Sequence, residues 1–96
     1  MCRQAAIYIM ANKKNGTIYT GVTVDLIRRI WEHRNKVIKS FTSRYDCTRL
    51  VYYELYDDLE FAISRERQIK SGPRAAKLKL INNDNPNWVD LYESIV

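Results

Sequence analysis

Cysteine and histidine are scarce in this sequence of 96 residues, which limits the disulfide and metal chemistry open to it. The two cysteines, Cys2 and Cys47, lie far apart without CxxC spacing, so neither a disulfide framework nor a zinc site is expected. A cage of several histidines is excluded because His33 is the only histidine. A resident metal would therefore be held mainly by carboxylate, water and substrate oxygens, which favours a hard ion such as Mg²⁺ or Mn²⁺.

Membrane and export signals are also missing. No apolar run approaches the ~18 residues that a membrane span needs. Residues 1–8 pass directly into a strand-like pattern, without the apolar core and cleavage site of a signal peptide. Low-complexity tracts and long repeats are absent. We therefore expect a cytoplasmic protein with no membrane partner, forming a single domain over residues 1–96.

Positive charge is in clear excess. The formal net charge is +5 and the pI is about 9.4. Phosphate backbones are common partners of such a surplus, because neutralising them releases counterions. A basic surface that serves only solubility is the alternative, and charge alone leaves both interpretations open.

Hydrophobic patterning predicts three strands, over residues 5–11, 17–22 and 49–56. Asn15-Gly16 predicts a tight hairpin turn between the first two strands. Helices are predicted over about 24–38, 58–70 and 74–82, and Pro86 can open a final short helix carrying Trp88, Leu91 and Tyr92. Thr23 is the expected N-cap of the first helix and Asp57 that of the second, with residues 40–48 as a loop. Strands and helices around one core indicate an α+β domain.

Glu66 interrupts an apolar helical row that also contains Leu59, Ala62 and Ile69. A buried carboxylate is costly unless it is paired or holds a metal, so this position is a candidate metal ligand. The alternative is a glutamate at the edge of the row that reaches solvent or an arginine such as Arg65.

Arg29 and His33 are four residues apart and therefore share one face of the first helix. A guanidinium beside the apolar row can clamp a phosphate through two parallel hydrogen bonds. The alternative is that both side chains are solvated or bonded to nearby carboxylates.

Tyr8 and Tyr19 are expected on the same face of the sheet. A two-residue loop at Asn15-Gly16 would pair Asn12 with Tyr19 and separate the tyrosines by roughly 13 Å, at about 3.4 Å per residue. A longer loop, with the register moved by two residues per strand, would place them opposite each other. The sequence leaves the register open, and plain packing is the alternative role of each ring.

The order of these residues resembles the GIY-YIG nuclease superfamily. Ala6-Ile7-Tyr8, followed after ten residues by Tyr19-Thr20-Gly21, resembles the two motifs that give the superfamily its name. Residues 25–33 resemble the helix that carries the family arginine and often a histidine. Glu66 resembles the metal-binding glutamate, and Asn85-Pro86-Asn87-Trp88 resembles a C-terminal motif whose asparagine supports the site.

The resemblance covers about residues 5–92 and points to the small stand-alone bacterial branch, of the URI-domain type. Ala6 replaces the first glycine and Thr20 replaces an aliphatic residue, and neither position carries a chemical group of the site. The implied fold is a three-stranded antiparallel sheet with flanking helices and a short C-terminal helix. The implied activity is metal-dependent hydrolysis of a DNA phosphodiester bond.

The resemblance also implies roles for individual residues. One Mg²⁺ or Mn²⁺ ion would be held by Glu66, and proton transfer and phosphate positioning would fall to the rest of the site. The implied catalytic residues are Tyr8, Tyr19, Arg29, His33, Glu66 and Asn85, although Asn82, Asn83 and Asn87 are rivals for the last role. Candidate nucleic-acid contacts outside the site are Arg28, Arg34, Lys36, Lys39, Arg44 and the stacking surface of Tyr45.

No appended DNA-reading module fits in this length, so weak sequence preference or recognition of a DNA structure is expected, unless a protein partner supplies specificity. Two other interpretations remain. One is a catalytically inactive nucleic-acid-binding module of the same fold, and the other is a protein-interaction domain whose basic surface meets acidic partners.

Overall fold

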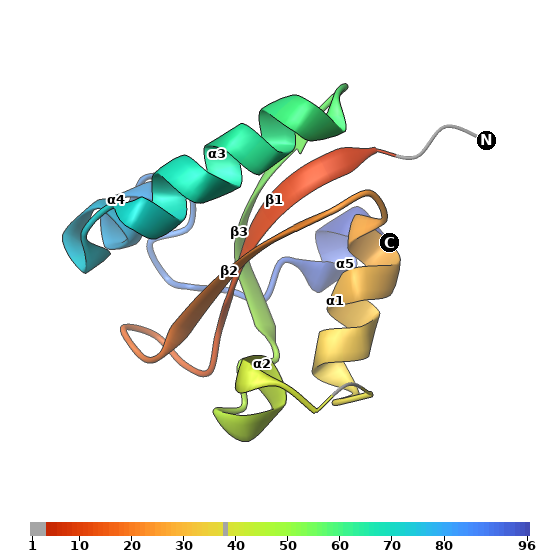
Figure 1. The fold of residues 1–96 in the computed structure, drawn as a ribbon. Helices are drawn as coiled ribbons and strands as arrows, with labels where there is room; N and C mark the ends of the chain where they lie inside the picture. The colour runs from red at the N-terminus through yellow and green to blue at the C-terminus, as the bar shows by residue number, and fades with distance from the viewer. Residues whose placement is uncertain (1–3, 38) are drawn as a thin grey trace.

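A three-stranded antiparallel sheet lies between helices on its two faces (Figure 1). The computed structural model describes residues 4–37 and 39–96. In chain order the elements are β1 (Ala5–Ala11), β2 (Ile18–Thr23), α1 (Leu26–Arg34), α2 (Phe41–Arg44), β3 (Arg49–Tyr56), α3 (Leu59–Ser71), α4 (Arg74–Asp84) and α5 (Tyr92–Ile95). The α+β class and the antiparallel sheet are confirmed, and strands β1 and β3 have the predicted bounds.

The middle strand, β1, is buried along its whole length, which explains why its sequence is apolar without alternation. Successive side chains of a strand point to opposite faces, so β1 supplies two cores. Ile7 and Ile9 pack with Ala62 and Ile69 of α3 on one face. Tyr8 and its neighbours of the same parity pack with Leu26 and Ile30 of α1 on the other face. Tyr8 therefore belongs to the α1 face of the sheet.

The β1–β2 hairpin has a four-residue loop rather than the two-residue loop that was one of the alternatives considered from sequence. The amide of Gly16 donates to the carbonyl of Lys13 at 3.0 Å, and Asn15 adopts a left-handed conformation with φ of 59°. The loop sets a register in which Met10 pairs with Tyr19, and Tyr8 pairs with Gly21. Tyr8 and Tyr19 are thus diagonal neighbours on one face, a register that lies between the two alternatives considered from sequence.

Helix α1 is shorter than predicted at both ends. Asp25, rather than Thr23, is the N-cap, and its carboxylate accepts from the amide of Arg28 at 3.2 Å. The helix ends at Arg34, and Lys36 has a positive φ of 52°, which a continuing helix does not allow. Residue 38, the last of the predicted helix, lies outside the described residues.

The second half of the chain differs from expectation mainly at caps and in the C-terminal segment. Asp58, rather than Asp57, caps α3 through the amide of Glu60 at 2.9 Å. The predicted short C-terminal helix is present, but it covers Tyr92–Ile95 and does not start at Pro86, because Trp88 is fully buried with a positive φ of 53°. Conversely, the expected loop before β3 contains the short helix α2. None of the helices in the described part of the chain has the length and apolar character needed to cross a membrane.

Candidate functional site

Tyr8 is the buried centre of a group of polar side chains on the α1 face. It is only 1% exposed and lies directly opposite Gly21 in β2. A β-carbon at position 21 would overlap the ring and hydroxyl of Tyr8. The glycine therefore leaves the space in which the phenol crosses the edge strand β2. This packing explains why the second motif needs glycine at this position.

The hydroxyl of Tyr8 bonds to His33 of α1. The phenolic oxygen lies 2.9 Å from Nε2 of the imidazole. The other ring nitrogen, Nδ1, lies 2.7 Å from Oγ1 of Thr42 in α2, which is itself 3.0 Å from Oγ of Ser40. The imidazole of His33, which belongs to α1, is thus hydrogen-bonded to Tyr8 through Nε2 and to Thr42 of α2 through Nδ1. Tyr8 and His33, two of the catalytic candidates from the sequence, are therefore in direct contact.

Tyr19 completes an aromatic group with these two residues. Its ring centroid lies 6.3 Å from that of Tyr8 and 5.8 Å from that of His33. Lys70 of α3 places its Nζ atom 5.7 Å from the centroid of the Tyr19 ring and 3.1 Å from a carboxylate oxygen of Glu66. Helix α3 packs on the other face of the sheet, but the charge of Glu66 acts on the Tyr8 hydroxyl and Lys70 contacts the Tyr19 ring. Glu66 is therefore near the tyrosines.

The carboxylate of Glu66 is partly buried, with 15% of its side chain exposed. Arg65, the partner considered from sequence, instead bonds Glu54 of β3 at 2.9 Å. Lys70 is the ion-pair partner that the structure gives Glu66, and it is itself about half exposed. A cation thus already occupies this carboxylate, and it belongs to a flexible side chain that another cation can displace.

Arg29 stands beside the site on α1. Its side chain is 43% exposed, and its Nε lies 3.4 Å from a carboxylate oxygen of Glu32. Arg28 contacts the same carboxylate at 3.5 Å. One glutamate therefore orients two guanidinium groups at the surface of α1. The exposed remainder of Arg29 has donors free to meet a phosphate.

Burial and neighbouring charges shift the pKa values of Tyr8 and His33. Burial, followed by the neighbouring Tyr19, raises the pKa of Tyr8 well above its usual value. The charge of Arg29 lowers that pKa, and Glu32 and Glu66 raise it, so all three act on the same hydroxyl. Burial and then the charge of Arg29 lower the pKa of His33, so its imidazole is neutral at pH 7.

Asn85 differs from the other predicted catalytic residues. It is buried, and its Nδ2 donates to the backbone carbonyls of Val51 at 3.1 Å and Val89 at 2.8 Å. Its Oδ1 accepts from the amide of Val89 at 3.0 Å. The side-chain amide therefore fixes the C-terminal segment against β3. Its rivals Asn82, Asn83 and Asn87 are all exposed, and Asn82 accepts from Nε1 of Trp88 at 2.8 Å.

The groups near Glu66 that could meet a hard metal ion are its own carboxylate and the phenols of Tyr8 and Tyr19. Within residues 4–37 and 39–96, no three His, Cys, Asp or Glu side chains gather into a ligand cluster. One partly buried carboxylate beside two phenols suits a hard divalent ion whose other ligands are water and phosphate oxygens. The donor set therefore fits Mg²⁺ or Mn²⁺.

An aromatic surface extends from the site along α2. Phe41 lies 6.0 Å from Tyr19 between ring centroids, and Tyr45 lies 4.6 Å from Phe41. The guanidinium of Arg44 stands 5.7 Å from the centroid of the Tyr45 ring. Phe41 and Tyr45 are both exposed. Stacking rings next to a cation are the combination that binds nucleobases and their phosphates together.

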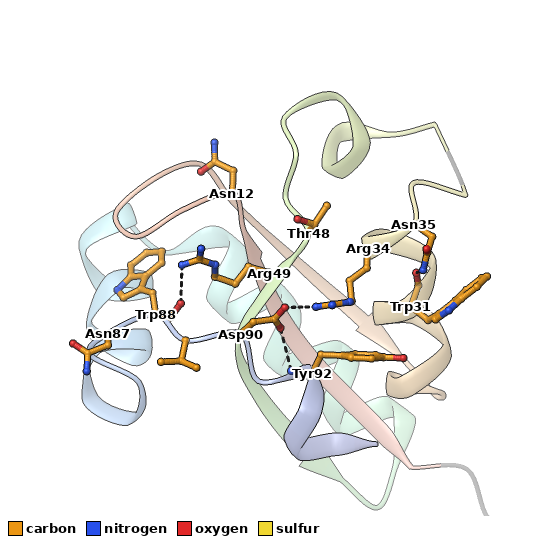
Figure 2. A pocket seen from close by; sticks show the side chains of 11 residues that line it. Asn12, Trp31, Arg34, Asn35, Thr48, Arg49, Asn87, Trp88, Asp90 and Tyr92 are labelled. Atoms are coloured by element: carbon orange, nitrogen blue, oxygen red, sulfur yellow. Dashed lines mark hydrogen bonds and ion pairs between the residues drawn. The ribbon is translucent and has the colours of Figure 1, made fainter.

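The other predicted nucleic-acid contacts have different surroundings. Arg34 pairs with Asp90, and its guanidinium lies 4.6 Å from the ring centroid of Tyr92. Figure 2 shows this pair, with Asp90 also accepting from the amide of Tyr92 at 3.1 Å. Because Asp90 accepts from Leu50 as well, Arg34 anchors the C-terminal segment to α1 rather than facing solvent freely. Two of the remaining predicted contacts form ion pairs, Lys36 with Asp46 and Arg28 with Glu32. Lys39 is exposed.

The pocket of Figure 2 is separate from the tyrosine site. It has a volume of about 900 Å³ and lies between the end of α1, the start of β3 and the C-terminal segment. Its lining includes Arg34, Arg49 and Asp90, but neither tyrosine of the site nor Glu66. The guanidinium of Arg49 donates to the carbonyl of Trp88 at 3.1 Å, so both arginines of this pocket serve local structure.

Several residues around the site were missed by sequence reasoning, among them Glu32, Lys70 and Thr42. Glu32 and Lys70 had a readable signal, since each lies three or four residues from an oppositely charged partner on its own helix. Thr42 had none, because an irregular segment separates it from His33.

Comparison with known proteins places this chain in a family. The model of the GIY-YIG catalytic domain matches residues 4–79. The UPF0213 protein SSP2268 of Staphylococcus saprophyticus is 40% identical over 76 residues, which cover 79% of this chain and 92% of that protein. The UPF0213 protein CPE1444 of Clostridium perfringens is 36% identical over 77 residues, covering 80% and 82% respectively.

A solved structure agrees. The solution NMR structure of the UPF0213 protein BH0048 from Bacillus halodurans has 30% sequence identity and a TM-score of 0.52, covering 82% of this chain and 83% of that chain. The matched region contains Tyr8, Tyr19, Arg29, His33 and Glu66. The chain therefore belongs to the GIY-YIG family of the nuclease superfamily and is a small member related to the UPF0213 proteins.

Proposed function

We propose that this protein is an endonuclease that hydrolyses a DNA phosphodiester bond with one divalent cation. The observation that carries the proposal is the group formed by Tyr8, Tyr19 and His33, with the charges of Arg29 and Glu66 acting on the Tyr8 hydroxyl. The group combines a proton-accepting chain, a phosphate-binding cation and a carboxylate suited to a metal. Phosphodiester hydrolysis needs all three functions at one phosphate.

Proton removal from the attacking water is assigned to Tyr8 and His33. A free phenolate is disfavoured, because burial raises the pKa of Tyr8. The 2.9 Å contact with Nε2 of His33 offers a second route. As the water oxygen bonds to phosphorus, its proton passes to the Tyr8 oxygen, and the original phenolic proton passes to the neutral imidazole.

Arg29 and Tyr19 are assigned to the phosphate. The exposed part of the Arg29 guanidinium donates to non-bridging oxygens, whose charge develops in the transition state. Tyr19 lies between the Tyr8 ring and Lys70, where its hydroxyl can position the water or the phosphate. Breaking the bond from phosphorus to the 3′ oxygen completes the exchange, and that oxygen leaves with the electron pair.

Glu66 is assigned to the cation. Its carboxylate would hold Mg²⁺ or Mn²⁺, with waters and the scissile phosphate supplying the other oxygens. When bound, such an ion polarises a phosphoryl oxygen and stabilises the leaving oxygen. Lys70, released from its 3.1 Å contact with Glu66, keeps its positive charge near the same phosphate.

DNA contacts beyond the cleaved bond are assigned to the exposed surface beside the site. Arg28, Lys39 and Arg44 supply positive charge, and Phe41 and Tyr45 supply rings for stacking. Phosphate contacts position a nucleic acid without reading its sequence. We therefore propose weak sequence preference, unless a protein partner adds specificity.

The test is a cleavage screen of the purified protein. Supercoiled plasmid, branched DNA and single-stranded DNA are each incubated with Mg²⁺, with Mn²⁺ and with EDTA. The proposal expects cutting that requires the divalent ion and stops with EDTA. DNA binding without cutting under any metal condition would overturn it in favour of an inactive binding module. A protein that shows no DNA affinity even at low salt would favour the protein-interaction alternative.

A further inference from the structure

We propose that Thr42 and Ser40 are positioning residues that fix His33 as its Nδ1–H tautomer, so that Nε2 is free to accept the proton of Tyr8. This inference deepens the proposed function and assigns two residues of α2 and its N-cap to the same site. It rests on four side chains joined in one series of hydrogen bonds. The series runs from Tyr8 through His33 and Thr42 to Ser40.

The distances leave two ways to arrange the hydrogens. In the outward arrangement Tyr8 donates to Nε2, Nδ1–H donates to Thr42, and Thr42 donates to Ser40. In the inward arrangement each donation is reversed, and Nε2–H donates to the oxygen of Tyr8. A neutral imidazole carries one proton, so its bonds to Tyr8 and Thr42 run in the same direction. Thr42 is 1% exposed, and Ser40 is the acceptor that the described residues offer its proton once Nδ1–H donates to Thr42.

Burial at the two ends favours the outward arrangement. Tyr8 is 1% exposed, and His33 is the hydrogen-bond partner that the described residues offer its hydroxyl. Inward donation would leave the phenolic proton without an acceptor among those residues. An unsatisfied buried donor costs more free energy than an exposed hydroxyl that can bond to water. Ser40 is exposed at the other end, so its hydroxyl proton can be donated to water. Within residues 4–37 and 39–96, the outward direction gives every donor of the series an acceptor or access to solvent.

The tautomer matters to the proton transfer proposed above. His33 can accept the phenolic proton only if Nε2 carries none beforehand. Thr42 ensures this by accepting from Nδ1 at 2.7 Å, and Ser40 keeps the lone pairs of Thr42 available by receiving the Thr42 proton. A second group that holds a catalytic histidine in the correct tautomer is a recurrent device in enzymes.

The test reads the tautomer directly. His33 is the only histidine, so ¹⁵N labelling of histidine and two-bond ¹H–¹⁵N correlation at pH 8 give one unambiguous pattern. The inference expects a protonated Nδ1 and a bare Nε2 in the wild-type protein. Thr42→Val should shift the ring toward Nε2–H, and Thr42→Ser should restore the wild-type pattern. Thr20→Val is the matched control, because it removes a buried hydroxyl from the opposite face of the sheet.

The rate of DNA cleavage provides a second test of this inference once activity is found. Thr42→Val should lower the single-turnover rate about tenfold or more without weakening DNA binding, and Thr42→Ser should recover most of it. Wild-type protein with Nε2–H, or a tautomer unchanged by Thr42→Val, would overturn the inference. If Thr42→Val does not fold, Thr42→Ala gives the same test, because it also removes the hydroxyl that accepts from Nδ1. The NMR measurement of the tautomer does not depend on nuclease activity, so failure of this inference is distinguishable from failure of the proposed function.

Discussion

Gly21 lies directly opposite Tyr8 in the sheet, and the absence of a side chain at Gly21 is what lets the Tyr8 phenol reach His33. A β-carbon there would lie well inside van der Waals distance of the Tyr8 ring. The ring is enclosed by its own core and cannot move away cheaply. The second motif of the family is thus explained by packing as much as by chemistry.

Gly21→Ala should therefore destabilise the protein by about 1–3 kcal/mol, the usual cost of overfilling a packed core. The displaced ring should also lose its bond to His33, so cleavage should fall. Urea unfolding measures the first effect. Gly72→Ala is the control, because a β-carbon at position 72 would meet its nearest neighbour at an ordinary 3.5 Å. Equal free energies of unfolding for the two variants would contradict this packing argument.

The pH dependence of stability should report on His33. Its pKa is lower in the folded protein than the value of 6.5 expected when unfolded, so below about pH 6.5 the unfolded chain binds more protons. The free energy of unfolding should therefore fall as pH drops from about 7.5 to about 5. Denaturation of wild type and His33→Gln across this range measures the effect. The pKa of Glu54 is also lowered in the folded protein, so its contribution is lost toward the acidic end of this range. A response between about pH 7.5 and pH 6 that persists in His33→Gln would contradict the assignment to His33.

Arg34 and Arg44 should respond differently to the same substitution. Arg34→Met removes the pair with Asp90 and the contact with Tyr92, so it should cost about 1 kcal/mol of stability. Arg44→Met should leave stability nearly unchanged and weaken DNA binding, with the salt dependence falling by about one counterion. Thermal unfolding and salt titrations of DNA affinity separate the two effects. The reverse pattern would show that Arg34 is the nucleic-acid contact.

The sheet was predictable where the sequence allowed one interpretation. β1 is an uninterrupted apolar run and β3 is rich in β-branched and aromatic residues, so both bounds followed from composition. The hairpin register was not predictable, because Asn15-Gly16 favours a two-residue turn while the chain forms a four-residue loop with only Asn15 in the left-handed region. Caps at Asp25 and Asp58 were each misassigned because another good capping residue lies one or two positions earlier.

The candidate site also contains residues that could be predicted from the sequence and residues that could not. Tyr8, Tyr19 and Glu66 were readable because the family motifs have a fixed order along the chain. The structural role of Arg34 was not readable, because its partner Asp90 lies 56 positions away and meets it only after folding. Asn85 followed the motif, yet the free amide that a catalytic role would need is used by backbone groups of Val51 and Val89. Sequence gives the residue types of a site more readily than their bonding partners.

The most direct test of the account is the single-turnover cleavage rate of end-labelled DNA in Mn²⁺ by wild type, Glu66→Gln and Glu60→Gln. Both glutamates lie on α3, but Glu60 is an exposed residue of the first turn and Glu66 reaches the tyrosine site. We predict a loss of about a hundredfold or more for Glu66→Gln and little change for Glu60→Gln. If Glu66→Gln cleaves DNA as fast as the wild type, the assignment of the cation to this carboxylate is contradicted.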